Sequence, residues 1–127
     1  GVTLPDSGDN SGKMKAVAYT TYSSLRLKEN ISPIAHPLQI LKNIDGVNFT
    51  WKKNKKKDVG FIAEEVGKHL PEIVEWEENQ VDAQAMDYTR LIPILVEAVK
   101  SQQGEIDALR STLESIKKKF YLPPDKE

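Results

Sequence analysis

The sequence predicts an α+β protein, in which a small domain of short strands and helices precedes a long C-terminal helix. Two patterns predict this fold. Between residues 47 and 63, two short segments rich in β-branched and aromatic residues flank a lysine-rich turn, which is typical of a β-hairpin. From residue 92 onward, apolar residues recur every three or four positions, which is typical of a coiled-coil helix.

The composition of the 127-residue chain limits its organisation and chemistry. This length accommodates one domain with a core and one extension. A net charge of −1 gives no reason to expect nucleic acid or an anionic membrane as a partner, so we expect a protein partner. The chain has no cysteine, and His36 and His69 lack metal-ligand spacing, so we expect neither a metal nor a cofactor. No apolar run approaches the roughly 20 residues that would span a bilayer.

The N-terminal part is expected to be a linker or the end of an upstream domain. Residues 1–13 are rich in glycine and small polar residues, a composition that does not support a packed core. Residues 16–22 (AVAYTTY) contain β-branched and aromatic residues, which predict a short strand. This strand would lead directly into two serines.

The middle of the chain predicts alternating helices and strands. Ser32 and Pro33 resemble a helix N-cap and first turn, with Pro37 as an alternative start, and Asp45 and Gly46 would stop this helix. The hairpin strands are predicted at residues 47–51 and 58–63, with a lysine-rich turn between them. A short helix is predicted at residues 64–70, and two further strands are predicted at residues 72–76 and 84–88 around an acidic turn.

Several side chains in this region have structural interpretations. Phe49, Trp51 and Phe61 are expected in the core, and Gly60 is expected to allow a close backbone approach. The lysine run at residues 52–57 is interpreted as a solvated turn. Glu64 and Glu65 resemble a catalytic carboxylate pair, but neighbouring residues on a helix point apart, so we interpret them as helix-start charges.

The terminal helix carries a continuous apolar stripe with one polar member. Asp87 or Thr89 would cap its start, and Pro123 and Pro124 would end it. A lone helix would expose this stripe to water, so we expect copies of the chain to cover it; the alternative is packing against its own globular part. The mixture of residue types in this stripe leaves the number of helices in the coiled coil open. The stripe, which we call the heptad stripe, consists of Ile92, Leu95, Val99, Gln102, Ile106, Leu109, Leu113, Ile116 and Phe120.

Two serines and a lysine form a candidate nucleophile and base. A lysine amine that has lost its proton can activate a serine hydroxyl. On a regular helix, Ser24 would face Lys28, whereas Ser23 is five residues from Lys28 and would face it only if the chain bends sharply or another subunit intervenes. Considered by spacing alone, the serine pair is more typical of a turn or cap than of catalysis.

Five segments in order strengthen the catalytic interpretation. They are SSLRLKENI, LQILKNIDGVNFTWK, DVGFIAEEVGKHLPEIV, AMDYTRLIPILVEAVK and the terminal heptad helix. Together they resemble, over residues 23–118, the peptidase S74 family of self-cleaving intramolecular chaperone domains. This family occurs in phage tailspikes, tail fibres and neck appendages, and in an animal transcription factor.

The resemblance implies roles for individual residues. Ser23 would be the nucleophile, Lys28 would assist it, and the Tyr22–Ser23 peptide bond would be cleaved. Ser24, Arg26, Glu29 and Asn30 occupy the remaining motif positions, which we interpret as orienting or structural. The second position is usually aspartate in the family and is Ser24 here.

The resemblance also implies an assembly and a location. We expect a homotrimer through the C-terminal helix, following an upstream fibrous domain of a phage structural protein made in the host cytoplasm, with the chaperone released by autoproteolysis. The expected divisions are residues 1–22 (remnant of the upstream domain), 23–90 (chaperone core), 91–122 (coiled-coil helix) and 123–127 (tail). The alternative from another class is a non-cleaving coiled-coil trimerisation module, and the animal relative would require a downstream membrane segment that this chain does not show.

Overall fold

The computed structural model describes residues 16–120 of the chain. The predicted linker at residues 1–13, the predicted tail at residues 123–127 and the helix end predicted at Pro123 and Pro124 lie outside this range. The chain divides into two compact units, Gly1–Ser32 and Pro33–Glu127. The boundaries predicted from the sequence at residues 22, 90 and 122 stay predictions.

The first unit contains one short regular element in its described part, the 3-10 helix η1 (Leu25–Leu27). The strand predicted at residues 16–22 is wrong, because these residues form no strand. β-Branched and aromatic residues favour a strand only where a partner satisfies the backbone hydrogen bonds. No such partner pairs with residues 16–22 within the described part of the chain.

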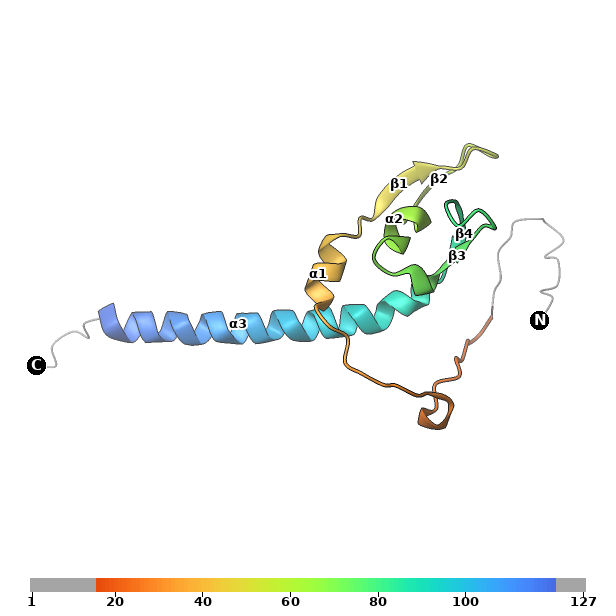
Figure 1. Cartoon of the computed structure of the whole chain (residues 1–127). Coiled ribbons are helices and arrows are strands. Elements are labelled where there is room, and N and C mark those ends of the chain that lie inside the picture. Colours follow the sequence, from red (N-terminus) through yellow and green to blue (C-terminus); the bar gives the residue numbers. More distant parts are fainter. Residues whose placement is uncertain (1–15, 121–127) are drawn as a thin grey trace, which may run out of the picture. The chain divides into compact units, whose positions relative to one another are not determined.

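The second unit has the predicted α+β order and ends in a long helix (Figure 1). It begins with α1 (Pro37–Lys42), so the alternative start at Pro37 is the correct one. The hairpin β1 (Val47–Thr50) and β2 (Lys57–Gly60) precedes α2 (Ala63–Gly67) and the 3-10 helix η2 (Pro71–Ile73). The strands β3 (Val74–Trp76) and β4 (Ala83–Met86) follow, and the 3-10 helix η3 (Tyr88–Leu91) leads into α3 (Ile92–Phe120).

The predicted β1–β2 hairpin is confirmed. The strands are antiparallel, with Val47 opposite Gly60 and Thr50 opposite Lys57. Val47 and Phe49 are half-buried on one face, as the alternating pattern predicts. Trp51 was expected in the core but is 51% exposed, because it lies beyond β1 at the turn, where its indole N–H donates to Asp58.

The second sheet is also antiparallel, with Val74 opposite Met86 and a bulge at Glu75 and Trp76. Its first strand is shorter than predicted, because η2 begins at Pro71 and occupies the residues before Val74. The proline ring holds φ near the helical value, which favours the 3-10 turn over an extended start.

The core lies between α1, α2, the β3–β4 sheet and the start of α3. One buried cluster joins these elements, and half-buried residues of α1 and its following loop pack against it. The helix α1 packs directly against α3. The buried members of the cluster are Val66, Leu70, Ile73, Val74, Leu91 and Ile94.

Two glycines allow aromatic rings to approach the backbone closely. A methyl group at Gly60 would meet the Tyr88 hydroxyl, and a methyl group at Gly67 would meet the indole ring of Trp76. The Tyr88 hydroxyl also accepts a hydrogen bond from the N–H of Phe61 at 2.9 Å. The close approach expected at Gly60 is therefore observed, and it connects the hairpin to the start of η3.

The helix α3 has two different apolar faces. Leu91, at the end of η3, and Ile94 and Ala98 of α3 point into the core and are buried. All residues of the heptad stripe are exposed, and α3 continues well beyond the globular part (Figure 1). The globular part of the chain therefore does not cover the stripe. Asp87 caps the preceding turn, since its carboxylate accepts from the Thr89 N–H at 3.0 Å.

Candidate active site

The 3-10 turn η1 brings Ser23 and Lys28 together. Ser24 is extended and precedes the turn, while the N–H of Leu27 donates to the Ser24 carbonyl at 3.0 Å. The N–H of Lys28 donates to the Leu25 carbonyl at 3.1 Å. Across this turn, the Lys28 ammonium group donates to Ser23 Oγ at 2.8 Å.

The local backbone explains how a separation of five residues permits this contact. Ser24 and Lys28, which flank the turn, both have extended backbone conformations (φ −64°, ψ 139° and φ −125°, ψ 146°). The chain therefore enters and leaves a tight turn in extended form, unlike a continuous helix or strand. The sharp bend that the Ser23 interpretation requires exists within one chain, so no neighbour is needed to make this contact.

Asn30 turns the chain shortly after Lys28. Its φ of 52° lies in the left-handed region, which costs most L-residues about 1–2 kcal/mol. Asparagine tolerates this conformation better than most other residues because its short amide can bond to the local backbone. The sequence signal for this backbone role is the residue type itself, whereas the motif marks Asn30 only as an orienting or structural position.

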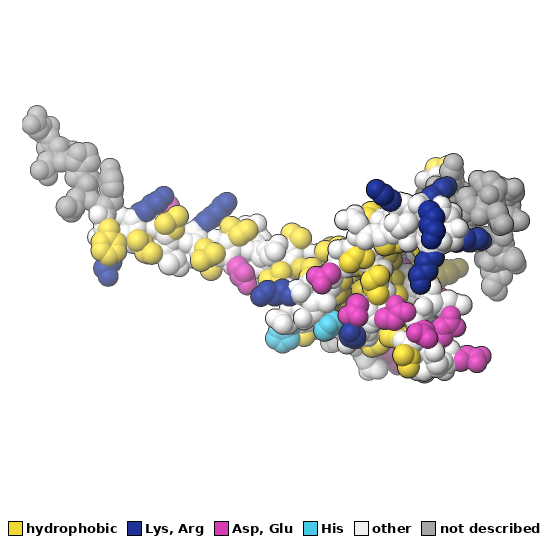
Figure 2. Space-filling view, turned by 90° about the horizontal axis from the view of Figure 1, so that it is seen from above, with side chains coloured by type: hydrophobic (Ala, Val, Ile, Leu, Met, Phe, Trp, Pro, Cys, Tyr) yellow, Lys and Arg dark blue, Asp and Glu magenta, His cyan; other side chains and the backbone are white. Residues whose placement is uncertain are grey.

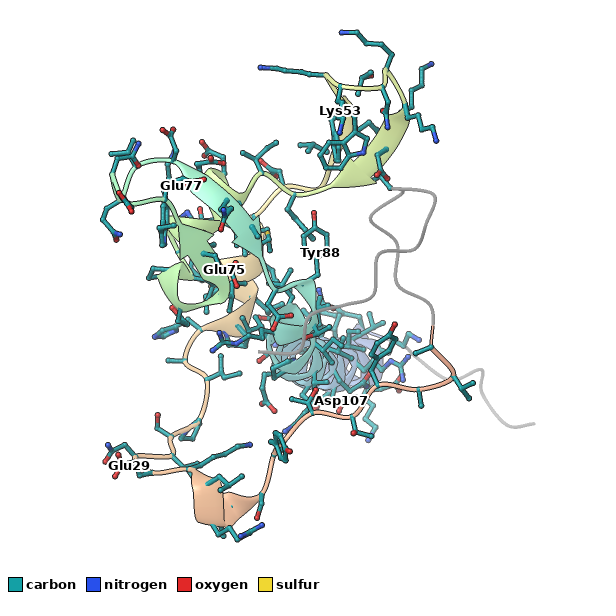
Figure 3. The ribbon with its side chains drawn as sticks, turned by 90° about the vertical axis from the view of Figure 1, so that its right-hand side faces the viewer. Glu29, Lys53, Glu75, Glu77, Tyr88 and Asp107 are labelled. Carbon is teal, nitrogen blue, oxygen red and sulfur yellow. The ribbon has the colours of Figure 1, made fainter. Side chains whose placement is uncertain are left out.

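The other candidate residues do not join the pair. Ser24 occupies the N-cap of η1, but its side chain makes no capping hydrogen bond. Within residues 16–120, the side chains of Arg26 and Glu29 form no hydrogen bond or ion pair with Ser23 or Lys28. Figure 3 labels Glu29, which lies in the loop after η1. The structure therefore selects Ser23 over Ser24 as the partner of Lys28.

The segment around the pair is open to solvent. Every described residue from 16 to 32 is exposed, including both members of the pair. Apolar side chains flank them: Tyr22 is 93% exposed, Leu25 is 73% exposed and Ile31 is 64% exposed. An apolar segment of this kind is unusual on a free surface, and it indicates a face that another surface covers.

The carboxylates of α2 do not pair with each other. Glu64 Oε1 accepts from the N–H of Ala83 at 2.9 Å, whereas Glu65 pairs with Lys68 at 2.8 Å. In residues 16–120, no group of three or more His, Asp or Glu side chains is arranged to hold a metal ion. No helix in that part of the chain is long and apolar enough to cross a membrane.

Comparison with known families gives a match over part of the chain. The model of the peptidase S74 family, described as chaperone of endosialidase, matches residues 23–75. This match confirms the predicted resemblance and supports a chaperone role, with self-cleaving peptidase activity as a general property of the family. A search of curated proteins gave no match. The resemblance over residues 76–118 stays a prediction.

Proposed function

We propose that this chain is a C-terminal intramolecular chaperone that trimerises, registers an upstream fibrous domain and releases itself by one cleavage at Tyr22–Ser23. The observation that carries this proposal is the 2.8 Å contact between Lys28 Nζ and Ser23 Oγ. The family match begins at Ser23, the residue that would become the new N-terminus. The proposed nucleophile and the start of the chaperone domain therefore coincide.

The cleavage step uses groups that lie next to each other. Ser23 Oγ attacks the carbonyl carbon of Tyr22 and passes its proton to a neutral Lys28 amine. The acyl group moves from the Ser23 nitrogen to its oxygen, and that nitrogen takes up a proton. Water then hydrolyses the resulting ester. This leaves a carboxylate on Tyr22 and restores the hydroxyl of Ser23, whose free amino group is now the N-terminus of the released chaperone.

Assembly would supply the environment that this step requires. In the observed hydrogen bond the lysine is the donor, whereas a general base must be neutral and accept the serine proton. Exclusion of water disfavours a charged amine, but Lys28 is exposed in the single chain. We infer that neighbouring chains bury the apolar segment around the pair, so that cleavage follows assembly.

The heptad stripe supports self-association as the route to assembly. Leu109 is 68% exposed, Val99 is 61% exposed and Phe120 is 75% exposed, all on a helix that extends away from its own core. Parallel association along α3 would hold the three upstream chains in register. Chains held in register would find the slowly folding, interwoven structure of the upstream domain sooner than separate chains. Removing the chaperone afterwards would leave a product that cannot unfold by the reverse path.

Mass spectrometry of the purified chain tests the cleavage. We expect a fragment of residues 23–127 to accumulate in the wild type and in Ser24→Ala. Ser23→Ala should lower the rate about a thousandfold or more, because the nucleophile is lost. Lys28→Arg should lower it by about a hundredfold or more, since arginine keeps the charge but cannot accept a proton. Loss of cleavage in Ser24→Ala alone would contradict the assignment of Ser23.

The alternative function is a trimerisation module that does not cleave, and one observation favours it. Ser24 replaces the usual aspartate and makes no capping hydrogen bond at η1, so a group that could orient the pair is missing. Under this alternative, the wild-type chain remains intact although sedimentation shows a trimer. A monomeric wild type would contradict both functions.

A further inference from the structure

The two hairpins of the second unit end in turns of opposite charge. The lysine tip, residues 52–57 from the turn after β1 to the start of β2, carries Lys52, Lys53, Lys55, Lys56 and Lys57, and Asp58 follows it on β2. The acidic turn, as we define it, comprises Glu77, Glu78 and Asp82 between β3 and β4 together with Glu75 of β3, and residues 71–89 contain no Lys or Arg. In Figure 2, dark blue side chains gather over one part of the globular unit and magenta side chains over another.

Hydrogen bonds give both turns a defined shape. In the lysine tip, the N–H of Lys55 donates to the Trp51 carbonyl at 2.9 Å, and the N–H of Trp51 donates to the Lys56 carbonyl at 2.9 Å. In the acidic turn, the N–H of Glu77 donates to the Asp82 carbonyl at 2.8 Å. Each turn is therefore ordered before any partner binds, which lowers the entropy cost of docking.

The two turns do not neutralise each other within the chain. The ion pairs among residues 16–120 are Lys68–Glu65, Lys100–Glu97 and Lys117–Glu114, and each joins residues three apart on a helix. All charged residues of the lysine tip and the acidic turn are exposed. Figure 3 shows Lys53 and Glu77 on two separate projections of the globular unit.

A ring of identical chains needs two different surfaces that complement each other. In a cyclic trimer, each subunit contacts its two neighbours through different faces, so the same surface cannot serve both contacts. A globular unit that presents a basic turn and a separate acidic turn meets this requirement. A basic tip that only kept the hairpin soluble would not need a matching acidic turn.

We propose that the lysine tip of one chain docks on the acidic turn of the next chain in the trimer, which rests on the proposed function. Opposite charges steer the subunits into one head-to-tail arrangement, and like charges oppose the reversed one. The charged contact therefore favours parallel association at the N-terminal end of α3. The heptad stripe alone leaves both the direction and the number of the associating helices open. Because these charges are exposed, salt weakens the contact.

Charge reversal in the full chain tests this contact. One variant carries Lys53→Glu, Lys55→Glu and Lys56→Glu; a second carries Glu75→Lys, Glu77→Lys and Glu78→Lys; a third combines all six and keeps the wild-type net charge. A fourth, with the same three lysines changed to glutamine, removes charge without introducing repulsion. Sedimentation at low and high ionic strength measures trimer dissociation, and circular dichroism confirms folding.

We expect each reversal to weaken the trimer about tenfold or more at low salt, the glutamine variant to weaken it less, and the six-fold variant to recover within about threefold of wild type. High salt should reduce these differences.

The inference is overturned if the wild type is trimeric and the two three-residue reversals assemble equally well, or if the six-fold variant does not recover. It is also overturned if the lysine changes leave the trimer intact and reduce only binding to heparin, a polyanion. That result would show that the lysine tip binds polyanions and not a neighbouring chain. A monomeric wild type would instead overturn the proposed function.

Discussion

At the residue scale, the Ser23–Lys28 pair depends on the short turn between its members. A helix or strand would separate side chains that are five residues apart, but η1 joins two extended residues and closes the distance to 2.8 Å. The contact is present in one exposed chain, whereas the cleavage that we propose would require removal of water from the amine. Contact and activation are thus separate requirements, and we assign the second to assembly.

The left-handed conformation of Asn30 leads to a prediction about positioning. Asn30→Gly should leave cleavage within about threefold of wild type, because glycine adopts a positive φ without steric cost. Asn30→Val should slow cleavage about tenfold to a hundredfold, since a β-branched residue disfavours this φ and shifts the segment that holds Lys28. The rates are measured by mass spectrometry of the purified chains.

The glycine variant separates a backbone role from a side-chain role at Asn30. If both Asn30→Gly and Asn30→Val lose cleavage, the amide itself is required and the backbone explanation is wrong. Sedimentation of all three proteins serves as the control, because a change at residue 30 should leave the α3 association intact.

At the element scale, the fold depends on close contacts that hydrophobic periodicity does not reveal. Tyr88, at the start of η3, approaches Gly60 at the end of β2, and Trp76 of β3 approaches Gly67 of α2. The first contact joins elements that are distant along the chain, and the second joins α2 to the strand that follows η2. The glycines therefore position the hairpins around the buried cluster.

Two glycine substitutions should have opposite effects on stability. Gly67→Ala should lower the free energy of unfolding by about 1–3 kcal/mol, because the added methyl group would meet the ring of Trp76 and overpack the core. Gly104→Ala should raise it by up to about 1 kcal/mol, because this mid-helix position is open and alanine favours a helix.

Urea unfolding monitored by circular dichroism compares these two variants with the wild type. Gly46→Ala is a further control for the added methyl group, since nothing lies within 4 Å of that position and it is outside α3. Equal stability of Gly67→Ala and wild type would show that the Trp76 ring moves aside without cost.

At the scale of the whole molecule, a leucine at the end of η3 and a leucine of α3 should have different roles. Leu91 is 5% exposed and belongs to the core, whereas Leu109 is 68% exposed and belongs to the heptad stripe. Leu91→Ala should lower the stability of the fold by about 2–5 kcal/mol, because it leaves a cavity. Leu109→Ala should weaken the trimer without disturbing the globular unit.

Thermal unfolding and sedimentation over a range of protein concentrations distinguish the two leucine variants. The Leu109→Ala protein should dissociate at a higher concentration than wild type and retain its near-ultraviolet circular dichroism. Trimerisation unaffected by Leu109→Ala, and by the same change at Leu113, would contradict association through the stripe.

Local sequence patterns were sufficient for most elements of the second unit. The alternation at Val47 and Phe49 predicted the hairpin, Asp87 predicted the cap before α3, and three-four spacing predicted the long helix. These features depend on residues close together in the chain. The strand predicted at residues 16–22 failed because propensity does not supply a pairing partner, and Trp51 was misplaced because the strand ends just before it.

The sequence by itself determined the α+β class, the order of helices and strands in the second unit, the family resemblance and the heptad stripe, because each depends on local spacing and residue type. Only the tertiary structure decided that Leu91, Ile94 and Ala98 fill the core while the stripe stays uncovered, because both faces of α3 are apolar. It also decided that Ser23, and not Ser24, meets Lys28. That choice depends on a backbone turn whose path residue spacing does not specify.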